Sequence, residues 1–403
     1  MSKVFTNSME NESVSFTGTT AHAPYKIKIW VCSLKRNGLT IIFCLFSLCL
    51  ILFSNTNLVA AKNGLTLWVT AVIPSLFPFF VATELLSYTN IISFLGKLLN
   101  PIMRPLFHVP GEAGFAFLMG LISGYPVGAK IVSHFMEQGI CTKEEAERML
   151  AFTNNSGPLF IIGTVGITLF GNTQVGILLF ITHILACISV GIVLRFFSTS
   201  DSKSYNQSFK CEKTFNLLTK NRDRNKISTT SSVSSKSTSA YQMQKKKNVT
   251  FSSLGELLGK SIMNSISTIL MIGGFVVIFS VLLSILRQSH ILDAVSNLFT
   301  PIFSFFQVSQ ECVAPFFSGI IELTNGVSLI ANIPLKTISI SIILCAFLLG
   351  FGGISILLQV FSIVAKNGLS IKTYFYGKLL QGLFAALYTF LALQFLPFLQ
   401  LNL

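Results

Sequence analysis

The sequence predicts an all-α membrane protein that crosses the bilayer several times and contains two repeats of opposite orientation. Of its 403 residues, 51% are hydrophobic and only 11% are charged, which is less than half the charged fraction of soluble domains. Several apolar stretches of about 20 residues, enough to span a bilayer, follow one another. Polar segments with Gly or Pro interrupt them at corresponding places in the two halves. Such paired breaks point to the binding site of a transporter.

The first half is expected to begin with a helix that stays in the membrane. A long polar lead ending in Lys35-Arg36 precedes it, unlike the short lead of a cleaved signal peptide. In chain order, the expected segments are a polar cytoplasmic lead (1–38), a first transmembrane helix (39–60), a second span (65–88), a semi-polar connector (90–110), an interrupted apolar segment (113–135), a soluble segment (136–148), a broken span (149–170) and an unbroken span (174–197).

A basic linker separates the halves. Residues 199–250 are rich in Ser, Thr, Lys and Asn, a composition that cannot bury enough apolar surface to fold, so we expect a disordered cytoplasmic segment. The first repeat is placed at 61–198 and the second at 251–403. The segments expected in the second repeat are a span (259–286), a semi-polar connector (287–311), an interrupted segment (312–333), a broken span (338–365) and a last span (373–396).

The two repeats match by the order of their elements and by a few residues. Asn100-Pro101-Ile102 corresponds to Thr300-Pro301-Ile302, and Gly120 corresponds to Gly319 just before each interruption. Cytoplasmic loops are enriched in Lys and Arg, which explains the net charge of +14 by topology and not by nucleic-acid binding. The same rule places the lead and the linker in the cytoplasm if both interrupted segments are re-entrant hairpins that enter from opposite sides.

Composition also argues against several classes of function. The eight cysteines are scattered without a C-x-x-C pair, so they are interpreted as small buried hydrophobic residues. Neither a disulfide framework nor a metal site is expected. The histidines show no metal-ligand spacing, and Ser123 has no evident base partner. We therefore expect no enzyme, no cofactor and no nucleic-acid partner; the expected partners are a small-molecule cargo and the lipid bilayer, and protein partners stay open.

Two long motifs carry a family resemblance. The segments Gly120-Leu-Ile-Ser-Gly-Tyr-Pro-Val-Gly-Ala-Lys130 and Phe152-Thr-Asn-Asn-Ser-Gly-Pro-Leu-Phe-Ile-Ile-Gly163 resemble the YlbJ family of sporulation integral membrane proteins, which carries the nucleoside-recognition Gate domain twice. The resemblance implies a fold similar to concentrative nucleoside transporters. It also implies transport of dipicolinic acid from mother cell toward forespore, across the outer forespore membrane.

Four breaks supply the candidate site. A dianion such as dipicolinate needs backbone N–H groups, which helix N-termini at the breaks provide. Two carboxylates in apolar surroundings are candidates for the coupling proton or cation: Glu322 and, with weaker support, Glu84. The candidate substrate-binding residues are Ser123, Gly124, Tyr125, Gly128, Lys130, Asn154, Asn155, Ser156, Gly157, Thr324, Asn325, Gly326, Gly352 and Gly353.

Each candidate also has a structural interpretation, and both stay open at this point. The glycines at the breaks suit close backbone approach to cargo or between helices. Lys130 pairs with a cargo carboxylate or extends to the cytoplasmic surface. Asn155 and its neighbours bind cargo or the freed backbone. The alternative functions are a proton-coupled nucleoside or metabolite transporter, and a membrane scaffold for spore-envelope assembly that transports nothing.

Overall fold

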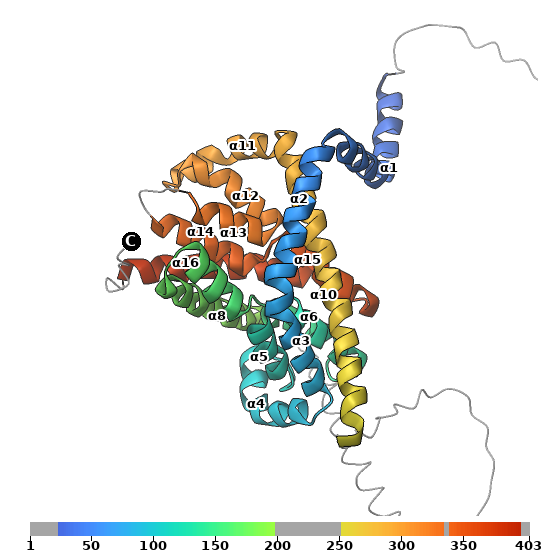
Figure 1. Ribbon diagram of the computed structural model, residues 1–403, viewed down its shortest axis with the longest axis vertical. Helices are drawn as coiled ribbons and strands as arrows, with labels where there is room; N and C mark the ends of the chain where they lie inside the picture. Colours follow the sequence, from blue (N-terminus) through green and yellow to red (C-terminus); the bar gives the residue numbers. More distant parts are fainter. Residues whose placement is uncertain (1–22, 198–250, 334–337, 396–403) are drawn as a thin grey trace, which may run out of the picture. The chain divides into compact units, whose positions relative to one another are not determined.

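Every element of the described residues is a helix, which confirms the predicted all-α class (Figure 1). The computed structural model describes residues 23–197, 251–333 and 338–395. The chain divides into two compact units, Met1–Asn55 and Thr56–Leu403. The candidate site belongs entirely to the second unit.

The first unit contributes one described helix, α1 (Ala23–Leu52). It begins within the predicted lead, and the next helix starts at Ser54, so the single helix expected over 39–60 is divided. The division falls at a polar run whose Ser, Asn and Thr side chains compete with the helical backbone for hydrogen bonds. The predicted linker 199–250 lies outside the described residues, as do residues 1–22.

The first repeat occupies the part of the second unit before the linker. The predicted soluble segment (136–148) contains a capping box, in which Thr142 and Glu145 bind each other's backbone N–H. In chain order, the helices are α2 (Ser54–Leu67), η1 (Trp68–Val72), α3 (Ile73–Ser87), α4 (Ile91–Phe107), α5 (Ala113–Ser123), α6 (Val127–Glu137), α7 (Lys143–Thr153), η2 (Leu159–Leu169) and α8 (Thr173–Phe196).

The second repeat follows the same order of elements: a long span, a short helix with an internal proline, a pair of short helices, a broken span and an unbroken span. In chain order, its helices are α10 (Phe251–Gln288), α11 (Ile291–Phe305), η3 (Gln310–Cys312), α12 (Val313–Ile321), α13 (Leu323–Ala331), α14 (Ile338–Phe351), α15 (Gly353–Val364), η4 (Ala365–Asn367) and α16 (Lys372–Phe395).

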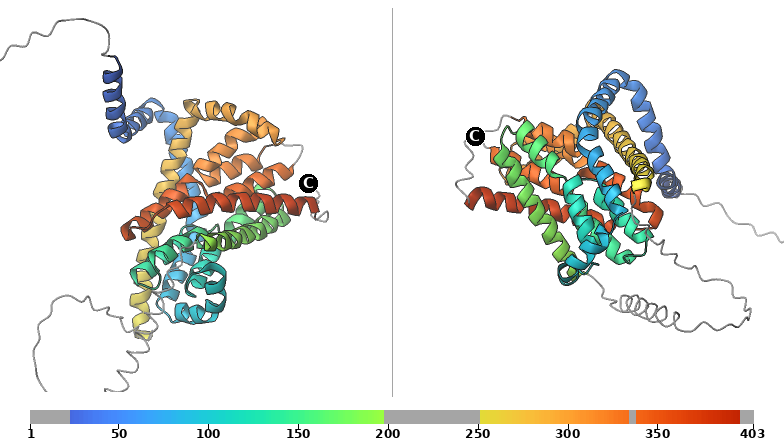
Figure 2. Two further views of the ribbon diagram at one scale, coloured as in Figure 1. Left: turned by 180° about the vertical axis from the view of Figure 1, so that it is seen from behind. Right: turned by 60° about the horizontal axis from the view of Figure 1, so that its bottom comes forward.

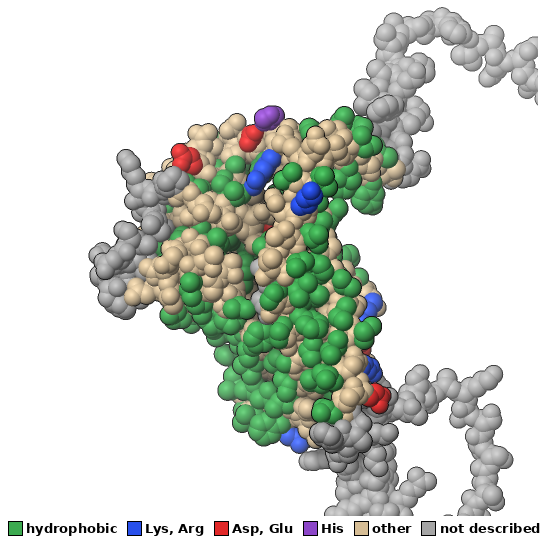
Figure 3. Space-filling view, in the orientation of Figure 1, with side chains coloured by type: hydrophobic (Ala, Val, Ile, Leu, Met, Phe, Trp, Pro, Cys, Tyr) green, Lys and Arg blue, Asp and Glu red, His purple; other side chains and the backbone are tan. Residues whose placement is uncertain are grey.

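The helices have the length and polarity of a polytopic membrane protein. Among the described residues, four segments are long and apolar enough to cross a bilayer, or up to six if each of two bent helix pairs counts as one span. On the face shown in Figure 3, hydrophobic side chains cover a broad area of the surface and charged side chains are few. This surface matches the lipid-facing exterior that the apolar stretches predicted.

Both interrupted segments fold back into hairpins, and a glycine pair lies at each crossing. A Cβ atom added to Gly326 would lie 2.0 Å from the Cα atom of Gly319, so α12 and α13 cross with their backbones in contact. In the first hairpin, a Cβ added to Gly120 would lie 3.5 Å from the Cα atom of Gly128, an ordinary contact, and both glycines pack most closely on the backbone carbonyl of Thr153 on α7. Small residues allow both kinds of close approach.

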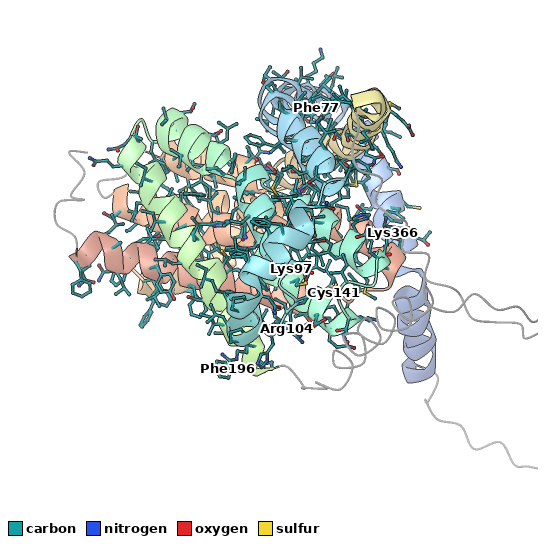
Figure 4. All side chains as sticks on the ribbon, turned by 90° about the horizontal axis from the view of Figure 1, so that it is seen from below. Phe77, Lys97, Arg104, Cys141, Phe196 and Lys366 are labelled. Atoms are coloured by element: carbon teal, nitrogen blue, oxygen red, sulfur yellow. The ribbon has the colours of Figure 1, made fainter. Side chains whose placement is uncertain are left out.

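The short helices α4 and α11 lie at opposite ends of the second unit, as an inverted repeat requires (Figures 1 and 2). Figure 4 labels Arg104, near the end of α4, and Phe196, the last residue of α8, in the view from below. Helices α4 and α8 contact each other, and the charges of Arg104 and Arg195 both lower the pKa of His108, so α4 and the C-terminal end of α8 share one end of the second unit. Which side of the membrane this end faces stays a prediction.

Two apolar clusters form the core of the second unit. Phe152 and Tyr374 belong to the first cluster, and Tyr125 and Leu349 belong to the second. Ile356, on α15, packs against both. The broken segments lie where these clusters adjoin, so their polar groups are surrounded by apolar side chains.

Candidate functional site

The four predicted breaks are present as interruptions of the helices, and their polar residues are buried. The backbone leaves the helix at Gly124–Pro126 between α5 and α6, and at Asn154–Pro158 between α7 and η2. It does so again at Glu322 between α12 and α13, and at Gly352 between α14 and α15. Ser123, Asn154, Asn155 and Ser156 are at most 2% exposed, so protein and not lipid covers the unwound backbone.

The breaks contact one another in a row. A Cβ atom added to Gly124, whose φ is +83°, would lie 3.0 Å from the backbone N of Gly157. The hydroxyl of Tyr125 donates a hydrogen bond to the carbonyl of Leu349 (3.3 Å), one turn before the break at Gly352. A Cβ added to Gly353 would in turn lie 3.3 Å from the backbone N of Leu323. Segments from both repeats therefore converge on one buried region.

A lysine from the last helix lies at the centre of this region. Lys378, on α16, is 1% exposed. Its Nζ donates to the backbone carbonyl of Asn154, to Oδ1 of Asn155 (3.3 Å) and to Oε1 of Gln381 (2.7 Å). An ammonium has three donors and no acceptor, so protein oxygens take all of them.

Further polar side chains complete the cluster. Gln381 Nε2 donates to Asn155 Oδ1 (2.9 Å), and Asn154 Nδ2 donates to the hydroxyl of Tyr374 (2.9 Å). The ring of His183, from α8, brings Nε2 to 3.5 Å from Gln381 Nε2. The Lys378 ammonium lies 5.2 Å from the ring centroid of Tyr125 and 5.8 Å from that of Tyr374, within the range of cation–π attraction.

The positive charge in this cluster has no carboxylate partner. None of the five ion pairs found among the described residues includes Lys378. Three helices, α6, η2 and α15, begin at the breaks without a hydrogen bond from the side chain of their own N-cap residue. At α6, however, the N–H of Ala129 donates to Asn154 Oδ1 (3.4 Å). Helix N-termini carry partial positive charge. The region is therefore suited to a negatively charged ligand.

Glu322 has a well-defined local role. Its carboxylate caps α13 by accepting hydrogen bonds from the backbone N–H groups of Thr324 (3.1 Å) and Asn325 (2.8 Å). The side-chain amide of Asn325 donates to the same carboxylate (2.8 Å). Gly326 lies in the hairpin crossing described above. Among the described hydrogen bonds, none joins Glu322, Thr324 or Asn325 to Lys378 or its partners.

Lys130 and Glu84 pair with each other. The Lys130 ammonium forms an ion pair with the Glu84 carboxylate and donates to the hydroxyl of Thr268 (3.1 Å). The hydroxyls of Thr83 and Ser123 are 3.3 Å apart. These contacts fasten both arms of the first hairpin to α3, and Lys130 also reaches α10. In the described conformation Lys130 therefore binds a protein carboxylate.

The centre of the cluster was not predicted from the sequence. Lys378, Gln381, Tyr374 and His183 were not among the predicted site residues, whereas Tyr125, Asn154, Asn155, Ser156 and Gly157 were. A signal was available, because an ionisable residue within an apolar span is a functional candidate by default. Lys378 stands in the middle of the predicted last span 373–396.

Comparisons with known proteins agree with this architecture. The Gate family model, described as nucleoside recognition, matches residues 69–199 and 269–367, one segment in each repeat. A Bacillus subtilis (strain 168) protein named sporulation integral membrane protein YlbJ is 35% identical over 332 residues, covering 82% of this chain and 76% of its own. No solved structure matches the chain significantly.

Proposed function

Because the chain belongs to the YlbJ family of Gate-domain integral membrane proteins, we propose that it carries a small organic anion across the membrane. The observation that supports this proposal is the buried Lys378 ammonium at the converging breaks, without a carboxylate partner among the described residues. A buried charge needs compensation. An anionic cargo supplies it, whereas a scaffold protein has no use for an uncompensated ammonium inside its core.

Dipicolinate is the cargo we propose, moved from mother cell toward forespore across the outer forespore membrane. The family resemblance motivates this choice, and the side chains are compatible with it. A carboxylate of the flat dianion is attracted to Lys378 and to the positive helix starts. The rings of Tyr125 and Tyr374 flank the ammonium at 5.2 and 5.8 Å, so aromatic surface is available for the pyridine ring.

The decisive experiment is uptake of labelled dipicolinate into liposomes that contain the purified protein, with and without a pH gradient. Replacing Lys378 by Met should reduce uptake about 10–100-fold, the factor expected from losing a hydrogen bond or close contact to a charged group. Lys372→Met is the matched control, because Lys372 lies on the same helix with an exposed side chain. Its uptake should stay unchanged.

The same assay separates the alternatives. Uptake of nucleosides in place of dipicolinate would favour the nucleoside transporter, which the description of the Gate model supports. No uptake of any solute by wild-type protein would favour the scaffold. Equal uptake by Lys378→Met and wild type would remove Lys378 from the site.

The coupling proposal is tested with Glu322→Gln. If Glu322 takes a coupling proton, the amide variant should lose the response to the pH gradient while it keeps part of the cap of α13. Thr324 and Asn325 donate to different carboxylate oxygens, and the amide retains one of them as an acceptor. An unchanged pH response would limit Glu322 to capping. Glu84 is examined in the same way with Glu84→Gln.

A further inference from the structure

The surroundings of the Lys378 ammonium have the composition of a cation site. Its acceptors are a backbone carbonyl of the unwound segment at Asn154, the amide oxygen of Asn155 and the amide oxygen of Gln381. In transporters with broken helices, unwound carbonyls coordinate the Na⁺ or H⁺ that drives transport. Neutral oxygens of this kind also suit an alkali cation, since hard cations prefer oxygen ligands.

We propose that the Lys378 ammonium is a built-in cation that occupies the position of a coupling Na⁺, so that this protein transports without binding Na⁺ at the break between α7 and η2. This inference rests on the proposed function, because only a transporter has a coupling ion. The geometry that supports it does not depend on the cargo.

Two features indicate that the ammonium takes the place of a metal ion and that no metal ion binds beside it. First, all three oxygens already accept from Nζ, so a metal ion would have to displace it. Second, no carboxylate pairs with Lys378 among the described residues, so a second cation beside it would be repelled without compensation. A tethered cation also needs no recruitment from solution.

Helix α16 presents the lysine to the unwound segment together with two polar neighbours. Tyr374, Lys378 and Gln381 recur at helical spacing, so one face of α16 presents all three to the unwound segment. Gln381 bridges the ammonium and Asn155, binding each through a different atom of its amide. The oxygens are thus held in place from two elements, α16 and the unwound segment.

A purely structural lysine gives a different expectation. If Lys378 only joins α16 to the unwound segment, truncating it lowers stability equally in any salt. If it stands in for Na⁺, truncation leaves a vacant set of oxygens that a free cation can enter, and that cation then stabilises the folded protein by mass action.

The test is the Tm of purified protein in detergent, measured in NaCl, LiCl, KCl and choline chloride at equal ionic strength. Wild-type Tm should be the same in all four salts. Lys378→Ala should be less stable in choline chloride and should gain about 5 °C at saturating Na⁺. Lys378→Met is the matched control, because its side chain removes the charge but fills the space, and it should gain nothing.

Two results would overturn the proposal. One is specific stabilisation of the wild type by Na⁺, or a Na⁺ requirement for its uptake of dipicolinate. The other is a Lys378→Ala variant whose Tm is indifferent to all three alkali cations. Lys378→Ser replaces the alanine variant if that protein does not fold, and the wild-type measurements decide if neither can be purified. Absence of dipicolinate uptake by wild type would instead contradict the proposed function and leave the Tm results valid.

Discussion

The break at Glu322 and the break at Asn154–Pro158 both leave backbone groups without helical partners. These groups are bound from nearby at the first break and from far along the chain at the second. At Glu322, one carboxylate binds two backbone N–H groups within the next three residues. At Asn154, a carbonyl of the unwound segment is bound by Lys378, 224 residues further along the chain. The first break is completed locally. The second is completed in part by α16, from far along the chain.

The difference bears on where the proposed cargo would bind. While it is ionised, the capping carboxylate of Glu322 repels an anion. The distant lysine brings positive charge, and its contacts depend on the position of α16 relative to the unwound segment. We therefore propose that cargo binding and helix movement act on the break completed over a long distance.

The largest expected effect comes from removing a distant partner. Gln381→Leu leaves the buried Lys378 ammonium with one acceptor fewer and Asn155 Oδ1 with one donor fewer. We expect a loss of about 3 kcal/mol in the free energy of unfolding, because unsatisfied buried charges are expensive. Thermal unfolding in detergent measures it. Stability equal to wild type would mean that the break at Asn154 is not held by α16.

A second effect tests the hairpin that carries the local break. In Gly326→Ala the added methyl group would lie 2.0 Å from the Cα atom of Gly319, so α12 and α13 must separate. We expect destabilisation of about 1–3 kcal/mol. Gly274→Ala, in α10 with no heavy atom within 4 Å of the added Cβ, is the control and should be neutral or stabilising. Equal Tm values for the two variants would contradict the close crossing.

A third, smaller effect separates capping from charge. Glu322→Ala removes the cap of α13 and should cost about 1 kcal/mol. Glu322→Gln keeps one of the two oxygens that accept from the N–H groups of Thr324 and Asn325, so it should recover part of that loss in Tm. If the glutamine variant is as unstable as the alanine variant, the negative charge itself and not the hydrogen bonding holds this break.

The smallest effect concerns a long-range contact near the ends of α6 and α15. Lys366 pairs with Glu137 (2.7 Å), and the hydrogen bond from Lys366 lowers the pKa of that carboxyl below its ordinary value of 4.5. A carboxyl group whose pKa is lowered in the folded state stabilises the folded protein at pH values above its ordinary pKa. This stabilisation is lost as the pH falls through the folded-state pKa. Because both side chains are at least 40% exposed, the contribution is no more than about 0.5 kcal/mol.

The measurement for this contact is the Tm of wild type and Lys366→Met between about pH 3 and pH 7. The difference between them should be small near neutrality and vanish below the pKa of Glu137. A large difference at neutral pH, or one that grows in acid, would mean that exposed long-range contacts matter as much as buried ones.

Local features of the fold were predictable from the sequence. The order of elements and all four breaks follow from apolar periodicity and from Gly, Pro and polar residues within about 20 residues of one another. The correspondence of Gly120 with Gly319 stays a prediction: Gly319 lies at the crossing of α12 and α13, whereas Gly120 packs most closely on Thr153 of α7. The division of the first helix before Ser54 was missed, although the polar run that begins there is a signal for it.

Contacts between distant segments were not predictable. Lys130 and Glu84 were each recognised as functional candidates, yet nothing local indicates that they pair with each other. Lys378 was overlooked because α16 has the composition of an ordinary span, and a single sequence does not tell which of its faces meets the unwound segment. Partner choice between segments more than 200 residues apart depends on packing, which one-dimensional patterns do not contain.

The three helix starts at α6, η2 and α15 are held in place together with Lys378 in a region that contains no described carboxylate within ion-pair distance of the ammonium. In the proposed function, an arriving anion would meet these positive helix ends and the ammonium with little reorientation of protein groups. Variants that loosen these helix starts should then weaken binding even where they leave every contacting side chain unchanged.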